Sequence, residues 1–225
     1  MSNFLQLCQA TRELAGLAGT GPTTTVAQTG ELKRLVNWVA QSWIDIQNLH
    51  KTWNFLITDL SFTTTASKGD YTLAEMLASD LRMLDESSLR CQQTSLGYQN
   101  RQFMDPWDWV HFRDLYRFNN LVEGRPTRFA VDPQTKSLSL ASIPDAAGYT
   151  ITGRYWKKPV ALVADTDTPI ISSEYHMLIV YWALSKYAGY EAAMEVKQEA
   201  GENRAKLLSA LENDQLPPME VGGAF

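Results

Sequence analysis

The chain has 225 residues, of which 44% are hydrophobic and 20% are charged, enough for a globular core that needs neither disulfides nor metal ions. Its formal net charge of −5 argues against a surface that grips nucleic acid by neutralising phosphates. Its apolar stretches fall short of the ~20 residues of a membrane-spanning helix, and the N-terminus lacks the basic start and apolar run of a secretory signal. These properties predict a soluble intracellular protein with reduced thiols at Cys8 and Cys91.

Periodic apolar residues predict two helices within residues 1–53. The first is expected over residues 4–14, and the loop GLAGTGPTTT that follows contains glycines and a proline, which interrupt helices. The second is expected over residues 31–53, with Thr29 as its N-cap. Its apolar positions recur every seven residues, at Leu32, Val39, Ile46 and Trp53.

Residues 54–171 are expected to form a β-rich insertion, because the apolar period changes to two. Strands are predicted in FLITDLSFTTT, in YTL, which returns after the turn SKGD, and in SSLRCQQ. The segment DPWDWVHFRDLYRF predicts a short helix near residues 105–118, with Asp105 as its N-cap and Pro106 in its first position.

Further along the insertion, RPTRFAVDPQTKSLSL predicts a strand, a turn and a second strand. Asp132 and Pro133 favour the turn, because Pro fixes its φ and Asp can bond its own backbone. The segment YTITGRYW is expected to add a third strand, so that a three-stranded antiparallel meander results.

Residues 172–214 are predicted to be helical again, with a bend at Gly189 as one option. Residues 215–225, QLPPMEVGGAF, are expected to form an extended tail, because Pro217 and Pro218 cannot continue a helix. The predicted fold is therefore an α+β single domain. Its N- and C-terminal helices form a bundle, an antiparallel β-rich region is inserted between them, and an extended C-terminal tail follows.

The sequence contains no pattern that indicates a reaction centre. The histidines, His50, His111 and His176, have no Cys or His neighbour at metal-ligand spacing, and GLAGTGP lacks the Lys and Ser or Thr of a phosphate-binding loop. Asp165 and Asp167 lie two residues apart, but two carboxylates do not fill a calcium shell, so that a solvated loop is favoured. No catalytic, metal-binding or cofactor-binding residue is assigned, and no enzymatic activity is expected.

Two alternative functions stay open at this point. Asp105, Asp108 and His111 would suit a hydrolase of unknown substrate if their side chains met in one pocket. The segment RYWKKP mixes aromatic and basic side chains, a combination that can bind nucleic acid. A module of the second kind would bind DNA with a strong dependence on salt.

Long segments of the chain also carry a family resemblance. FRDLYRFNNLVEGRPTRFAVDPQTKSLSLASIPDAAGYTITGRYWKKP is followed by DTPIISSEYHMLIVYWALSKYAGYEAA and by LLSALENDQLPP. This succession resembles the head-to-tail connector, or adaptor, proteins of tailed bacteriophages. The N-terminal helical segment and DLSFTTTASKGDYTL fit the same family, so that the resemblance covers almost the whole chain.

The resemblance implies a structural virion protein at the head–tail junction, made in the host cytoplasm. Such proteins form a ring, usually a dodecamer, beneath the portal, and the ring extends the DNA channel, serves viral assembly and genome ejection, and presents a surface to the tail. The implied partners are the portal protein, tail or nozzle proteins, further copies of the chain, and double-stranded DNA that passes without sequence-specific binding. No cofactor and no membrane is implied. A tail-completion protein on the tail side is the close alternative.

In the family that the sequence resembles, a C-terminal extension often contacts the portal. The resemblance therefore implies that the tail of this chain binds the portal, at Leu216, Pro217, Pro218, Met219, Val221 and Phe225. The acidic balance of the chain would also suit a channel wall, because such a wall repels DNA and lets it slide.

Overall fold

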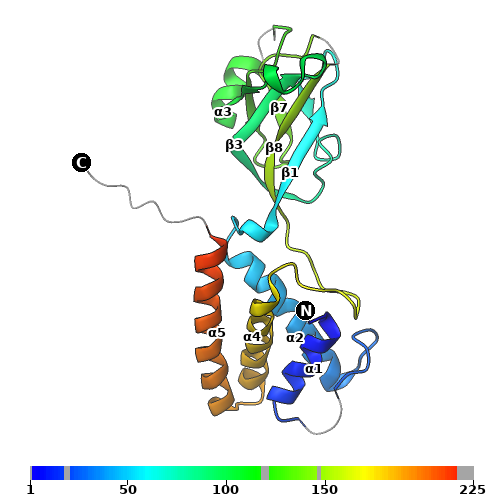
Figure 1. Cartoon of the computed structure of the whole chain (residues 1–225), viewed down its shortest axis with the longest axis vertical. Coiled ribbons are helices and arrows are strands. Elements are labelled where there is room, and N and C mark those ends of the chain that lie inside the picture. The colour runs from blue at the N-terminus through cyan, green and yellow to red at the C-terminus, as the bar shows by residue number, and fades with distance from the viewer. Residues whose placement is uncertain (1, 18–20, 118–121, 146–147, 217–225) are drawn as a thin grey trace, which may run out of the picture. The chain divides into compact units, whose positions relative to one another are not determined.

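The computed structural model describes residues 2–17, 21–117, 122–145 and 148–216. The chain divides into two compact units, one of Met1–Phe55 with Pro159–Phe225 and one of Leu56–Lys158. Helices form the first unit and strands dominate the second (Figure 1). The predicted α+β class, with a β-rich region inserted between N- and C-terminal helices, is confirmed. That the whole chain behaves as a single domain stays a prediction.

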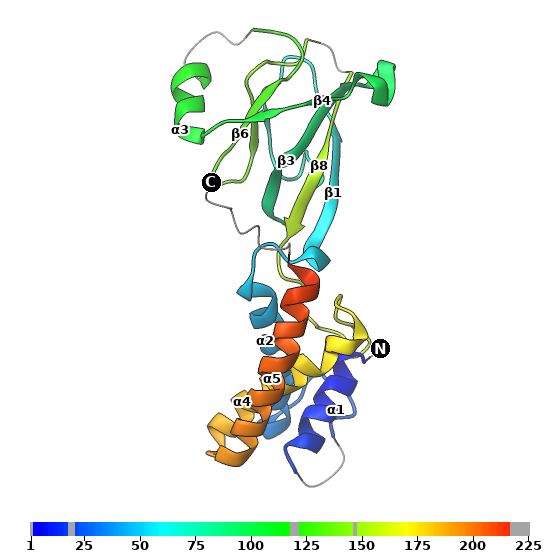
Figure 2. The same ribbon diagram turned by 60° about the vertical axis from the view of Figure 1, so that its left-hand side comes forward.

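The helical unit is built around α4 (His176–Tyr190), which packs against α1 (Phe4–Leu14), α2 (Gly30–Leu49) and α5 (Met194–Gln215). Side chains are buried on several faces of α4, as expected for a helix surrounded by others. In contrast, α5 packs mainly against α4 and runs alongside it in both views (Figures 1 and 2).

Local hydrogen bonds explain where α1 begins and α2 ends. Asn3 and Gln6 form a reciprocal capping box, so that the predicted helix over residues 4–14 is confirmed. The N-cap at Thr29 is confirmed in position, although its side chain makes no capping hydrogen bond. The predicted end at Trp53 is wrong, because His50 adopts an extended conformation (φ −127°, ψ 142°) and ends α2.

The C-terminal helical segment is two helices. After the short turn η4 (Ser173–Tyr175), with Ser172 as its N-cap, α4 ends at Tyr190 and α5 begins at Met194. Ala192 lies between them in the left-handed region (φ 56°), which ends a helix rather than bending it.

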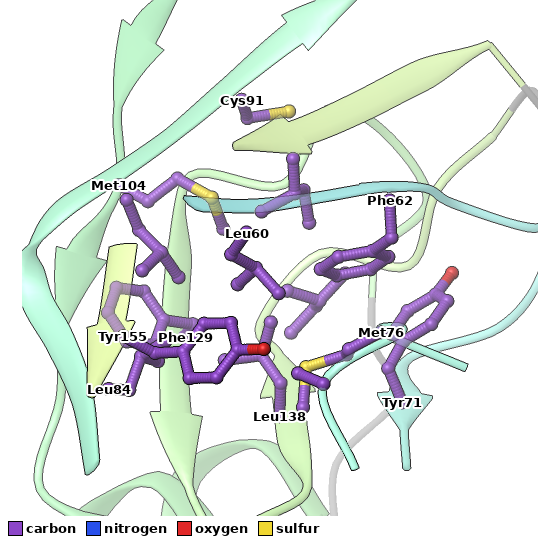
Figure 3. Packing of buried hydrophobic residues seen from close by; sticks show 14 of the residues in the cluster. Leu60, Phe62, Tyr71, Met76, Leu84, Cys91, Met104, Phe129, Leu138 and Tyr155 are labelled. Atoms are coloured by element: carbon purple, nitrogen blue, oxygen red, sulfur yellow. The ribbon is translucent and has the colours of Figure 1, made fainter. Parts of the chain in front are cut away.

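The described residues of the β-rich unit form two four-stranded sheets. One has the order β1 (Ile57–Thr63), β8 (Tyr149–Lys157), β3 (Leu81–Gln93) and β4 (Gln102–Phe103). The other has the order β2 (Asp70–Tyr71), β7 (Leu138–Leu140), β6 (Arg128–Val131) and β5 (Asp105–Pro106). Side chains from both sheets, with Met76 and Met104, form a common buried core (Figure 3).

Strand positions were predicted better than strand partners. The β6–β7 hairpin is confirmed, and Asp132 accepts the backbone N–H of Gln134 in its turn. The meander is wrong, because the third strand, β8, pairs with β1 and β3 in the other sheet. The strand at YTL does not return along β1 either, because β2 pairs with β7. Alternation identifies the buried face of a strand but not its neighbour.

The helix predicted near residues 105–118 is shorter and begins later. Asp105 donates its N–H to the carbonyl of Thr127 at 2.9 Å and lies with Pro106 in β5, parallel to β6. The N-cap is Asp108, followed by α3 (Trp109–Phe112) and the π-helical turn η3 (Arg113–Arg117). Residue 118 lies outside the described part of the chain.

The β-rich unit also ends earlier than the predicted residue 171. Its last strand ends at Lys157, and the segment that follows forms backbone hydrogen bonds with α1. Phe4 donates its N–H to the carbonyl of Asp167 at 2.7 Å, and Leu5 donates to the carbonyl of Asp165 at 3.2 Å.

Among the helices that the structure describes, none has the length and hydrophobicity of a membrane-spanning segment.

Candidate assembly surfaces

Of the tail that is predicted to bind the portal, the structure describes Leu216, which follows α5. Leu216 is the C-cap of this helix, with an extended conformation (φ −99°, ψ 149°), and its N–H donates to the carbonyl of Glu212 at 3.0 Å. Of the other residues predicted to bind the portal, none lies within the described part of the chain; they are Pro217, Pro218, Met219, Val221 and Phe225. Their binding role stays a prediction.

The side chains considered for a hydrolase cap a helix on the surface. The Oδ2 atom of Asp108 accepts the N–H groups of Val110 at 3.0 Å and His111 at 3.2 Å, and these bonds, the one from His111 first, lower the pKa of Asp108. The ring of His111 lies 3.3 Å from the same carboxylate, and the two side chains are 80% and 64% exposed. Asp105 belongs to β5 and is also exposed. This arrangement does not form the enclosed pocket that the hydrolase alternative requires.

Side chains of the strand end RYWKKP form contacts within the β-rich unit. Tyr155 is buried, its hydroxyl donates to Asp80 at 2.7 Å, and burial, together with this carboxylate, raises its pKa to about 12. Arg154 pairs with Asp85 at 2.9 Å, and Lys158 donates to the carbonyl of Ser79 at 3.3 Å. A ring in the core is not accessible for base stacking, so that the nucleic-acid alternative loses one of its aromatic residues.

Asp165 and Asp167 lie in a largely exposed loop, as predicted, and their side chains anchor it. Asp165 accepts hydrogen bonds from the N–H and hydroxyl of Thr25, and Asp167 accepts the N–H groups of Val163 at 2.7 Å and Ala164 at 2.8 Å. These bonds lower the pKa of both carboxyls. Within residues 2–17, 21–117, 122–145 and 148–216, no three His, Cys, Asp or Glu side chains gather in a way that could hold a metal ion.

The cysteines are buried free thiols. Burial, with Asp165 as a smaller cause, raises the pKa of Cys8 to about 12. Burial also raises the pKa of Cys91, although Arg125 opposes the shift. Because only the thiolate reacts readily, we expect iodoacetamide to label neither cysteine of the native protein at mildly alkaline pH and both after unfolding in guanidinium chloride. Rapid labelling of the native protein, followed by mass spectrometry, would contradict this expectation.

The burial of His176 predicts that the stability of the protein depends on pH. Its Nδ1 accepts the N–H of Ser2 at 3.1 Å and its Nε2 donates to the carbonyl of Ile171 at 3.3 Å, which fixes the neutral tautomer, and burial lowers its pKa. The resulting stabilisation is present above the unfolded pKa of about 6.5 and is lost as the pH falls toward the folded pKa. We expect the Tm to fall between about pH 7 and pH 5 and His176→Gln to reduce this slope. Equal slopes of Tm against pH in the wild type and in His176→Gln would refute this expectation. The control is His111→Gln, a change at an exposed histidine, which is expected to leave the slope unchanged.

Beside α3, the buried ring of Phe112 packs with the partly buried rings of Trp107, Trp109 and Tyr116, a cluster that the sequence did not predict. The rings of Trp107, Phe112 and Tyr116 lie 5.2–5.7 Å apart as neighbours, and Arg128 lies over Trp107 and donates to the hydroxyl of Tyr116 at 2.9 Å. Trp109 lines two hollows, of about 190 Å³ and about 440 Å³. Aromatic residues and Arg are enriched in protein interfaces. The signal in the sequence is the density of aromatic residues in DPWDWVHF, which also fits the predicted short helix.

Comparison with known proteins bears on the whole chain. A family model described as "SU10 adaptor protein" matches residues 2–220. The match includes both compact units and extends into the predicted tail. No curated protein matches the chain.

Proposed function

Because the chain belongs to the SU10 adaptor protein family, we propose that it is a structural virion protein that forms an adaptor ring between the portal and the tail of a bacteriophage. The ring, a dodecamer in this proposal, extends the DNA channel and lets double-stranded DNA pass without sequence-specific binding. Its partners are the portal protein, the tail or nozzle proteins and the neighbouring copies, and its place in the virion is the head–tail junction.

The observation that carries the proposal is the extent of the family match, from residue 2 to residue 220. A match of this length covers nearly the whole chain and does not depend on one short motif. The placement of Asp108 and His111 on an exposed helix start supports a structural role over the hydrolase alternative.

We propose that the tail from Leu216 to Phe225 is the arm that binds the portal. Met219, Val221 and Phe225 supply apolar side chains, and Pro217 and Pro218 restrict the backbone. A restricted segment loses less conformational entropy when it binds. The extended conformation of Leu216 supports an arm that departs from α5 without continuing it.

The experiment that tests the proposed function is a binding assay with purified partners from the same phage. The full chain would be mixed with portal rings and, separately, with tail proteins, and complexes would be followed by co-sedimentation and electron microscopy. We expect the chain to form rings on the portal. Binding to the tail alone would support a tail-completion protein instead, and binding to neither would overturn the proposal.

A further inference from the structure

Three arginines meet on the outer face of the β1–β8–β3–β4 sheet. Arg90 pairs in register with Thr152, Arg154 lies two residues further along β8, and Arg101 donates to the hydroxyl of Thr152 at 2.7 Å. The next residues inward, Leu89 and Ile151, are buried. The arginines therefore lie on the opposite face and, with Asp59, Ser87, Ser88 and Gly153, line a hollow of about 290 Å³. We call this feature the arginine notch.

The guanidinium groups of the arginine notch are held in place. Arg154 pairs with Asp85 at 2.9 Å, and Arg90 donates through Nη1 to the carbonyls of Ser87 and Leu89, both at 3.0 Å. Among the described residues, these hydrogen bonds use one nitrogen of each arginine, whereas a guanidinium has five N–H donors. Asp59 lines the same hollow and Asp85 pairs with Arg154, so that three guanidinium groups and two carboxylates leave one positive charge in excess. The arginine notch can thus bind a further anion, and Arg pairs with carboxylates in a bidentate manner.

Exposed apolar residues beside the arginine notch indicate a protein partner. The turn η2 (Thr94–Asn100) buries none of its residues and projects beyond β4 (Figure 2). Tyr98 is 75% exposed and Phe103 is 47% exposed. The guanidinium group of Arg101 lies over the ring of Tyr98, and that of Arg90 lies over the ring of Phe103. Tyr, Phe and Arg together are typical of protein interfaces. The net charge of −5 argues against nucleic acid as the partner, and the anionic groups that a protein partner offers are carboxylates.

The helix α5 carries a row of exposed carboxylates. Glu195, Glu199 and Glu202 are exposed and follow one another at helical spacings of four and three residues, which places them on one side of the helix. The residues that α5 buries, Ala200 and Leu211, lie on another side. Glu195 and Glu199 are separated by about 6 Å along the axis. Arg101 and Arg154 are each one strand away from Arg90 and two residues along, a diagonal separation of about 7–8 Å, which the long side chains of Arg and Glu can span.

We propose that the arginine notch of one copy binds the carboxylate row of α5 in the neighbouring copy. The two surfaces differ, so that the contact is head-to-tail, the kind that closes into a ring when the rotation allows it. This inference rests on the proposed function, because it assigns the contact between copies within the adaptor ring. The attraction between opposite charges gives the contact its specificity and its dependence on salt.

The test reverses the charges on each side in turn. Arg90→Glu with Arg101→Glu is expected to raise the concentration for half-assembly at least about tenfold. Adding Glu199→Arg and Glu202→Arg to the same chain is expected to restore assembly, because the reversed positions on the two surfaces then carry opposite charges again. The matched control is Arg113→Glu with Lys33→Glu, the same change of charge at exposed positions outside the arginine notch, and we expect it to assemble like wild type.

Assembly would be measured by sedimentation of the protein alone and by electron microscopy on the portal. Circular dichroism of each variant separates a failure to assemble from a failure to fold. Normal assembly of the first variant, or no rescue by the fourfold variant, would overturn the inference. A wild-type chain that forms no oligomer in either setting would overturn it as well. Rings of the first variant on the portal would refute this inference alone, and the proposed function would then stand.

Discussion

A chain that ends at Leu216 is expected to fold like the full chain and to bind the portal at least about 100-fold more weakly. The truncation removes the apolar side chains of Met219, Val221 and Phe225, each worth about 1.5–3 kcal/mol when fully buried, and 1.4 kcal/mol corresponds to a factor of ten in affinity. It keeps the last hydrogen bond of α5, from Leu216 to Glu212. Surface plasmon resonance on immobilised portal rings measures the affinity, and the Tm of the two chains reports on folding.

Two controls make this truncation specific. Glu220→Gln changes a charge in the tail without removing an apolar side chain, and we expect near wild-type binding. Alanine at Met219, Val221 and Phe225 together should reproduce most of the loss at full length. Equal portal affinity of the truncated and full chains would show that another surface binds the portal, with the aromatic cluster around Trp107 as the next one to test.

Replacing Trp53 by alanine is expected to cost about 3–5 kcal/mol of stability. Trp53 is fully buried, and its Nε1 donates to the carbonyl of Ile46 at 3.1 Å. Its ring also contacts Phe55 at 5.3 Å and His50 at 4.8 Å between centroids. The variant therefore leaves a large cavity and a carbonyl without its partner. Urea unfolding followed by circular dichroism of the helices measures the loss.

Trp182→Ala provides the comparison for this variant. Trp182 is only partly buried, and Arg204 lies over its ring with 4.7 Å between the guanidinium carbon and the centroid. We expect a loss of about 1–2 kcal/mol, because less area is removed from contact. If Trp53→Ala cost no more than Trp182→Ala, the account of how the end of α2 is held would be wrong.

The elements that were predicted well depend on neighbours in sequence. The helix α1 is predicted by apolar residues at helical spacing, and in the structure the neighbouring pair Asn3 and Gln6 caps its start. The β6–β7 hairpin follows from alternation around a turn that Asp132 stabilises. In such cases local chemistry and the final structure agree, and the sequence alone is sufficient.

The predictions that failed depend on contacts between distant segments. Asp105 and Asp108 are equally good N-caps by residue type, and the choice is made by the bond from Asp105 to Thr127. The partners of β8 are likewise chosen by the common core and not by its own pattern. The position of Trp53, which contacts Ile46 from outside α2, also needs the folded chain.

Of the candidate surfaces, the sequence predicts the tail, whereas the arginine notch depends on the folded chain. The composition of the tail can be read directly, because prolines and apolar residues follow one another in QLPPMEVGGAF. The arginine notch cannot, because Arg90, Arg101 and Arg154 come from β3, the segment before β4, and β8, and only the pairing of these strands brings them together.

A reconstruction of the head–tail junction in the intact virion by cryo-electron microscopy tests the central claim most directly. The account predicts that copies of this chain form a closed ring between the portal and the tail, with their C-terminal arms on the portal. A ring attached only to the tail, or a junction without this chain, would contradict it.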